Sequence, residues 1–174
     1  IRRTDWFAAE PTRASLPDDA LFAAFVQWLR TDARFYFTRP EQLLAAYRDV
    51  AKRIDAHLPE LFGTLPRLPY GVREIPRFMA PSQTTAYYQP GSLKAGNCGW
   101  FYANTYALDQ RPKYEMVPLT LHEAVPGHHL QIALAQELPE RHPLRQEMGF
   151  NAFVEGWALY RDRKSTRLNS SHVS

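Results

Sequence analysis

The chain of 174 residues has 45% hydrophobic and 13% aromatic residues, enough for a hydrophobic core in one domain or in a piece of a larger one. Its single cysteine, Cys98, excludes an internal disulfide, and the lack of an apolar run of about 18 residues excludes a membrane-spanning helix. The net charge of +3 arises within residues 161–174, so the rest of the chain is neutral overall and nucleic-acid binding is not indicated.

Two amphipathic helices are predicted in the first third of the chain. Residues 18–30 start with Asp18 and Asp19, which suit a helix N-terminus, and continue with apolar residues at helical spacing. Residues 41–57 repeat this pattern directly after Pro40, a residue that is well tolerated in a first helical turn. Both helices are expected to be scaffold.

Extended segments are predicted in the middle of the chain. Prolines over residues 59–81 argue against long helices, and residues 72–78 and 84–89 are interpreted as short extended pieces. The aromatic and β-branched run 101–106 is predicted to be a strand.

The strand 101–106 is also a candidate for substrate binding. We expect it to lie at the edge of a cleft, where an extended peptide pairs with its backbone, with Asn104 and Tyr102 as candidate substrate contacts. An ordinary scaffold strand remains the alternative.

Two further helices are expected in the last third. One begins at Glu115 or Thr120 and continues to about Leu138, and the other spans residues 145–160. The polar and aperiodic residues 162–174 are expected to be a non-native or disordered tail, which leaves residues 1–161 as the folded part. The predicted fold class is therefore mainly α, with a short β-hairpin or edge strand.

Residues 122–129, His-Glu-Ala-Val-Pro-Gly-His-His, carry the strongest chemical signal. They hold three of the six histidines of the chain, and Glu123 directly follows the first of them. Neutral imidazoles are the commonest protein ligands of Zn²⁺, and a neighbouring glutamate suits a general base that activates water. The octet therefore predicts a zinc site in which His122 is a ligand and Glu123 is the catalytic base.

The second ligand does not follow the usual spacing. Zinc peptidases place histidines at positions i and i+4, but position 126 is a proline here. On a straight helix His128 lies roughly 9 Å beyond His122 along the axis, too far to share one ion. Because Pro126 disrupts the helix and Gly127 tolerates unusual backbone angles, we expect a bulge that returns His128 to the face of His122. His128 is preferred as the ligand, and His129 stays open.

Glu155 is the predicted third ligand. It is an acid in an otherwise apolar helical segment, and a buried carboxylate needs a partner such as a metal ion. The alternative is a structural role in which Glu155 forms an ion pair with an arginine. The other histidines and acids of this region are expected at the surface or on solvated faces: His57, His142, Glu137, Glu140 and Glu147.

The octet and the segment 153–160, Phe-Val-Glu-Gly-Trp-Ala-Leu-Tyr, resemble the bacterial metallopeptidase-like proteins of domain-of-unknown-function family 885. Ala86-Tyr87-Tyr88 and the run 101–105 also resemble that family's pattern. The family is similar in layout to gluzincin peptidases, in which two histidines of one helix and a glutamate of the next hold zinc. The resemblance implies a larger helical enzyme, of which residues 1–161 would be a central fragment, and a bacterial, exported or periplasmic location.

Three functions are compatible with these residues. The first is a zinc-dependent peptidase with Glu123 as general base and a peptide or small molecule as substrate. The second is a metal-dependent hydrolase of a non-peptide amide or an ester, because the same chemistry serves those bonds. The third is a non-catalytic metal-binding module, for which a fourth protein ligand such as His129 would close the site.

Overall fold

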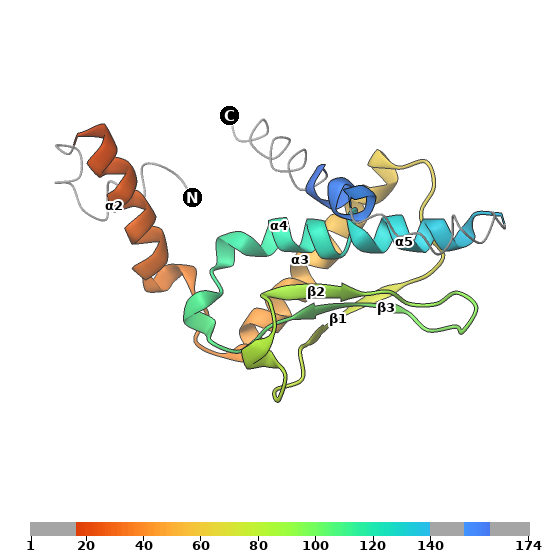
Figure 1. Ribbon diagram of the computed structural model, residues 1–174, viewed down its shortest axis with the longest axis horizontal. Coiled ribbons are helices and arrows are strands. Elements are labelled where there is room, and N and C mark those ends of the chain that lie inside the picture. Colours follow the sequence, from red (N-terminus) through yellow and green to blue (C-terminus); the bar gives the residue numbers. More distant parts are fainter. Residues whose placement is uncertain (1–16, 140–151, 161–174) are drawn as a thin grey trace.

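The computed structural model describes residues 17–139 and 152–160. Within these residues the fold is mainly helical with little β-structure, as predicted, and the strands form one small three-stranded sheet. Helices α3, α4 and α5 lie on one side of the sheet, and α2 extends away from it (Figure 1). No helix in the described ranges is both long enough and apolar enough to cross a membrane.

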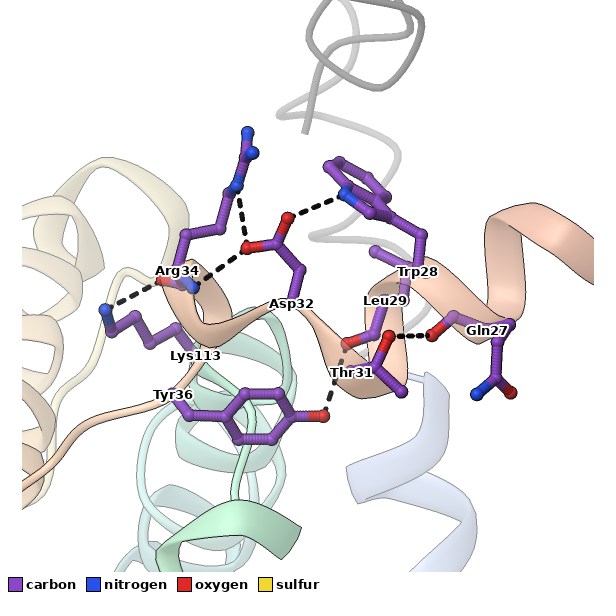
Figure 2. A network of polar contacts seen from close by, with 8 residues as sticks. All are labelled: Gln27, Trp28, Leu29, Thr31, Asp32, Arg34, Tyr36 and Lys113. Atoms are coloured by element: carbon purple, nitrogen blue, oxygen red, sulfur yellow. Dashed lines mark hydrogen bonds and ion pairs between the residues drawn. The ribbon is translucent and has the colours of Figure 1, made fainter. Parts of the chain in front are cut away.

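Helix α2, Asp18–Thr31, ends in a polar network around Asp32 (Figure 2). The Asp32 carboxylate accepts hydrogen bonds from the Trp28 indole at 2.7 Å and from the backbone N–H of Arg34 at 3.0 Å. The Arg34 N–H is the main reason why the pKa of Asp32 lies below its ordinary value. Lys113 donates to the carbonyl of Arg34 and so connects this turn to the segment that precedes the octet.

Helix α3 spans Pro40–Leu61 and runs past the predicted end at residue 57. It contains Pro59 in its last turn, where a proline removes few intrahelical hydrogen bonds. The helix buries one apolar face, and the Tyr47 ring contacts the Phe101 ring edge to face at 5.2 Å. The buried positions of this face are Leu43, Tyr47, Val50, Ala51 and Leu58.

The sheet has the strand order β1-β3-β2, with β1 at Tyr70–Glu74, β2 at Ala86–Gln89 and β3 at Gly99–Ala103. Strand β3 pairs parallel with β1 and antiparallel with β2, with which it forms a hairpin. The predicted edge strand 101–106 is therefore wrong in position and in length, because β3 is central and ends at residue 103. Phe101 and Ala103 are fully buried, as expected for a strand with neighbours on both sides.

Two helices replace the single helix predicted around the octet. Helix α4 spans Met116–Glu123 and α5 spans His128–Glu137, so the chain leaves helical geometry between them. Of the last predicted helix, residues 152–160 are helical, and residues 145–151 lie outside the described ranges, as does the predicted tail. Short 3₁₀ helices occur at Ala33–Phe35, Ala80–Ser82, Leu108–Gln110 and Lys113–Glu115.

Candidate metal centre

The break between α4 and α5 determines the geometry of the octet. The N–H of Ala124 still donates to Thr120, but the N–H of His129 donates to Ala124, five residues back, at 3.0 Å. This spacing is that of a π-type turn, which is wider than an α-helical turn. The predicted widening at Pro126 is therefore present, although it separates two helices and does not lie within a continuous one.

Gly127 allows the two helices to meet closely. A Cβ atom at this position would lie 1.8 Å from the carbonyl oxygen of His122, so no other residue fits without a backbone shift. The φ of Gly127 is −79°, which shows that the close approach, and not a left-handed conformation, requires glycine. As a result the His122 and His128 rings meet edge to face with centroids 4.8 Å apart.

Glu155 joins the two imidazoles from the helical residues 152–160. Its Oε2 lies 3.3 Å from His122 Nε2, and its Oε1 lies 3.7 Å from His128 Nε2. This segment lies over the junction of α4 and α5 (Figure 1), where the Trp157 indole donates a 2.7 Å hydrogen bond to the Pro126 carbonyl. The structure thus brings together the three residues that the sequence indicated as ligands. The expected burial of Glu155 is wrong, because its side chain is 55% exposed, so its place in the cluster rests on its distances to the two imidazoles.

The donor set of this cluster fits zinc. One ligand atom from each of His122, His128 and Glu155 lies within 4.8 Å of the other two. Tetrahedral zinc with bonds of about 2.0–2.1 Å separates its ligand atoms by about 3.4 Å. The distances of 3.3 and 3.7 Å from the Glu155 oxygens to the two imidazole nitrogens are close to this value. Nδ1 of His128 is buried without a hydrogen-bond partner among the described residues, so Nε2 is the nitrogen that faces the cluster.

His129 has a different position. It is 2% exposed, its Nδ1 lies 2.8 Å from the Tyr88 hydroxyl, and its ring packs against Tyr70. Burial lowers the pKa of His129 to about 4 and keeps the ring neutral in the folded chain. His128, the histidine that the sequence favoured, therefore belongs to the cluster, and His129 belongs to the core.

Glu123 borders the cluster and a pocket. Its side chain is 13% exposed, and its Oε2 lies 4.0 Å from His128 Nε2. Burial raises the pKa of Glu123, and the nearby His122 and the backbone N–H of Tyr88 offset part of this effect. The pocket has a volume of about 280 Å³ and is lined by Glu115, Pro118, Leu119, His122 and Glu123.

The two candidate substrate contacts do not line this pocket. Asn104 is 1% exposed; its amide donates to the carbonyls of Ala80 and Thr84, and its Oδ1 accepts from the N–H of Tyr106. Tyr102 is buried and stacks on another tyrosine ring, and its hydroxyl accepts from Arg73. Because the polar atoms of both side chains have intramolecular partners, the structure supports structural roles for them.

Two surface predictions have different outcomes. His57 is exposed, as expected, and lies near Glu60 on the same helix. The expectation of a solvated Glu137 is wrong, because its side chain is only 17% exposed and accepts hydrogen bonds from the backbone N–H and the Nε of Arg67. The predictions for His142, Glu140 and Glu147 lie outside the described residues.

Sequence reasoning missed two residues that shape the site. Glu115 lines the pocket. It precedes His122 by seven residues, or about two helical turns, and this spacing could have indicated that both lie on the same face of the helix. Trp157 was expected only as an apolar residue, and no sequence pattern indicates that its N–H reaches Pro126.

A solved structure and a family profile resemble the chain, whereas no curated protein sequence matches it significantly. A solved structure described as "the putative lipoprotein from Colwellia psychrerythraea" superposes with a TM-score of 0.77 at 29% sequence identity and covers 85% of this chain. The chain spans 26% of the length of that protein. A family profile described as "Bacterial protein of unknown function (DUF885)" matches residues 8–166, and because this match covers most of the sequence, the chain belongs to domain-of-unknown-function family 885.

Proposed function

We propose that the cluster of His122, His128 and Glu155 is the zinc site of a hydrolase and that its substrates are peptides. The observation that carries this proposal is the convergence of two imidazole nitrogens and a carboxylate within 4.8 Å, beside the largely buried Glu123. Two histidines and one carboxylate leave a fourth position of a tetrahedral ion open, which is the arrangement of catalytic and not of structural zinc.

Each residue has a separate task in this proposal. His122 and His128 would hold the ion through their Nε2 atoms, and Glu155 would supply a negative charge that offsets part of the charge of the ion. When bound, zinc supplies a Lewis acid that brings the pKa of water to about 7 and polarises a carbonyl. The break at residues 124–127 orients the two rings, and the segment 152–160 orients the carboxylate.

Glu123 is the proposed general base. Its carboxylate accepts a proton from the attacking water and delivers it to the nitrogen of the leaving amine. Its position supports this task, because the side chain is only 13% exposed and its Oε2 lies 4.0 Å from His128 Nε2, beside the proposed ligand atoms. His122 and His128 lie on either side of the carboxylate in the octet, so the base and the ligands are positioned by the same backbone.

The test combines zinc content with peptide hydrolysis. Zinc binding is measured on the present chain, and turnover on a full-length family member with the corresponding substitutions, because this chain spans 26% of its solved relative. We expect Glu123→Gln to retain zinc and to lose at least about 100-fold in kcat, the lower range for a general base. Glu60→Gln, which removes an exposed carboxylate from α3, is the control and leaves both unchanged.

Two results would contradict the proposal. Turnover that is unchanged by Glu123→Gln removes this residue from the mechanism, and absence of stoichiometric zinc in the wild type removes the site. A panel of peptides, other amides and esters decides the bond type, and cleavage of esters alone would replace the peptidase by an esterase.

We also propose that the longer protein acts outside the cytoplasm. The support is the similarity to the solved protein from Colwellia psychrerythraea, which is described as a lipoprotein. Cell fractionation of a bacterium that expresses a full-length family member checks this, and recovery in the cytosol alone would contradict it.

A further inference from the structure

We infer that the pocket beside the cluster selects peptides with a lysine or arginine near the cleaved bond and that Glu115 binds the cationic group. This inference rests on the proposed function, because it assigns a substrate class to the same site. Its starting point is the lining of the pocket, which runs along one face of α4 from Glu115 to His122 and Glu123.

Glu115 provides the recognition charge. It is exposed, and its carboxylate has no hydrogen bond or ion pair with any residue in the described ranges. It directly precedes α4 with right-handed helical backbone angles, φ −86° and ψ −10°. Seven residues of helix place it on the same face as His122 at a distance of about 10 Å along the axis.

The remaining lining matches the rest of a basic side chain. Pro118 and Leu119 present apolar surface between the two ends of the pocket, and the aliphatic stem of lysine or arginine packs on such surface while its charge stays in water. The ionisable lining residues are Glu115, His122 and Glu123, and no lysine or arginine is among them. Together with Glu155 the site carries three carboxylates, which outweigh the two positive charges of a zinc ion, so the pocket favours a cationic over an acidic side chain.

The distance also fits a residue close to the reacting carbonyl. Of the separation of about 10 Å, one residue of extended chain covers about 3.5 Å, and the long stem of lysine or arginine covers most of the other ~6.5 Å. A basic residue within two positions of the cleaved bond therefore reaches Glu115 while the bond lies at Glu123.

The experiment compares matched peptides on a full-length family member. The peptides are internally quenched and differ at a single position, which carries lysine, arginine, norleucine or glutamate. Each position within two residues of the cleaved bond, on either side, is varied in turn. At one of these positions we expect kcat/KM to be about 5-fold higher for lysine than for norleucine, the upper range for one exposed ion pair. Glu115→Gln reduces this ratio to about 2 or less, and Glu115→Lys makes glutamate the better substrate. Glu41→Gln, an exposed acid that does not line the pocket, keeps the wild-type ratio.

A second measurement does not depend on the folding of any variant. Because the ion pair is partly exposed, raising the salt concentration from about 0.05 to about 0.5 M reduces the lysine-to-norleucine ratio of the wild type by several-fold. An acid at a helix N-terminus also stabilises the helix, so thermal unfolding of Glu115→Gln is measured in parallel. A loss of stability with an unchanged ratio would assign Glu115 to the helix alone and overturn the inference.

The two proposals fail in different ways. If no peptide is cleaved, the proposed function is wrong. If peptides are cleaved but the wild type shows no basic preference, or Glu115→Gln keeps the preference, the peptidase stands and the substrate inference is wrong.

Discussion

The indole N–H of Trp157 donates a hydrogen bond to the carbonyl oxygen of Pro126, 31 residues earlier in the chain. The acceptor is one of the carbonyls that the helix break removes from helical pairing, and the donor lies two residues after Glu155. The same backbone break that turns His128 toward His122 therefore also anchors the segment that carries the carboxylate. The Trp157 ring adds packing against the cluster of Leu58, Val125 and Leu130.

Replacing Trp157 with phenylalanine is expected to weaken zinc binding. The ring remains, but the hydrogen bond to Pro126 is lost and Glu155 becomes less well oriented. Loss of such supporting contacts commonly costs 10–100-fold in metal affinity, and we expect about 10-fold here. Isothermal titration with zinc measures the effect. Trp28→Phe removes an indole hydrogen bond far from the site and is expected to leave zinc affinity unchanged.

Gly127→Ala is expected to disrupt the junction of the two helices. The new Cβ atom would meet the backbone oxygens of His122 and Leu121, which cannot move as a side chain can. We expect a loss of about 3 kcal/mol in the free energy of unfolding, at the upper end for overpacking, together with loss of zinc binding. Urea unfolding measures the change in the free energy of unfolding. Gly63→Ala, where a Cβ atom meets nothing within 4 Å, is the control, and equal stability of the two variants would argue against the close approach.

The two adjacent histidines are expected to behave differently toward zinc. Zinc at a hundredfold excess over its Kd stabilises the folded chain by about 2.7 kcal/mol. We expect His128→Ala to abolish this stabilisation and His129→Phe to keep it, because His129 contacts Tyr88 and Tyr70 in the core. Thermal unfolding with and without zinc measures the difference. A loss of the zinc effect only in His129→Phe would reverse the assignment of the ligand.

Asn104→Ala is expected to destabilise the fold. The buried side-chain amide donates hydrogen bonds to the loop that leads to β2. Its removal leaves the carbonyls of Ala80 and Thr84 with one donor fewer. The expected loss is about 2 kcal/mol in the free energy of unfolding, measured with urea. Unchanged stability combined with a raised KM in the full-length enzyme would restore Asn104 as a substrate contact.

The contact between Glu137 and Arg67 is expected to give a pH-dependent contribution to stability. Two hydrogen bonds, above all from the backbone N–H of Arg67, lower the pKa of Glu137 in the folded chain. A carboxyl group whose pKa is lower in the folded than in the unfolded chain stabilises the fold. This stabilisation is complete above the pKa of the unfolded chain, about 4.3, and is lost as the pH falls through the pKa of the folded chain. Glu137→Gln therefore lowers stability at pH 7 but not in strong acid. A difference between wild type and variant that persists in strong acid would contradict this origin.

Local patterns were sufficient for the helices α2 and α3, because their apolar residues recur at helical spacing, although only α3 buries a full apolar face. They failed for β3, since its central place depends on which strands lie beside it, and Phe101 to Ala103 are equally apolar whether one or both edges are paired. They failed for Glu137 because Arg67 is 70 residues away in the chain.

The amino-acid sequence by itself determined the chemistry of the candidate site: two imidazoles, a carboxylate from a later helix, an adjacent acid, and a Pro-Gly pair that cannot continue a helix. The tertiary structure decided which histidine turns toward His122, because only the packed α4–α5 junction distinguishes His128 from the buried His129. It also decided that Glu115 opens onto the same pocket. The sequence specifies the types of side chain, whereas the distances between the candidate ligand atoms depend on contacts between segments that are far apart in sequence.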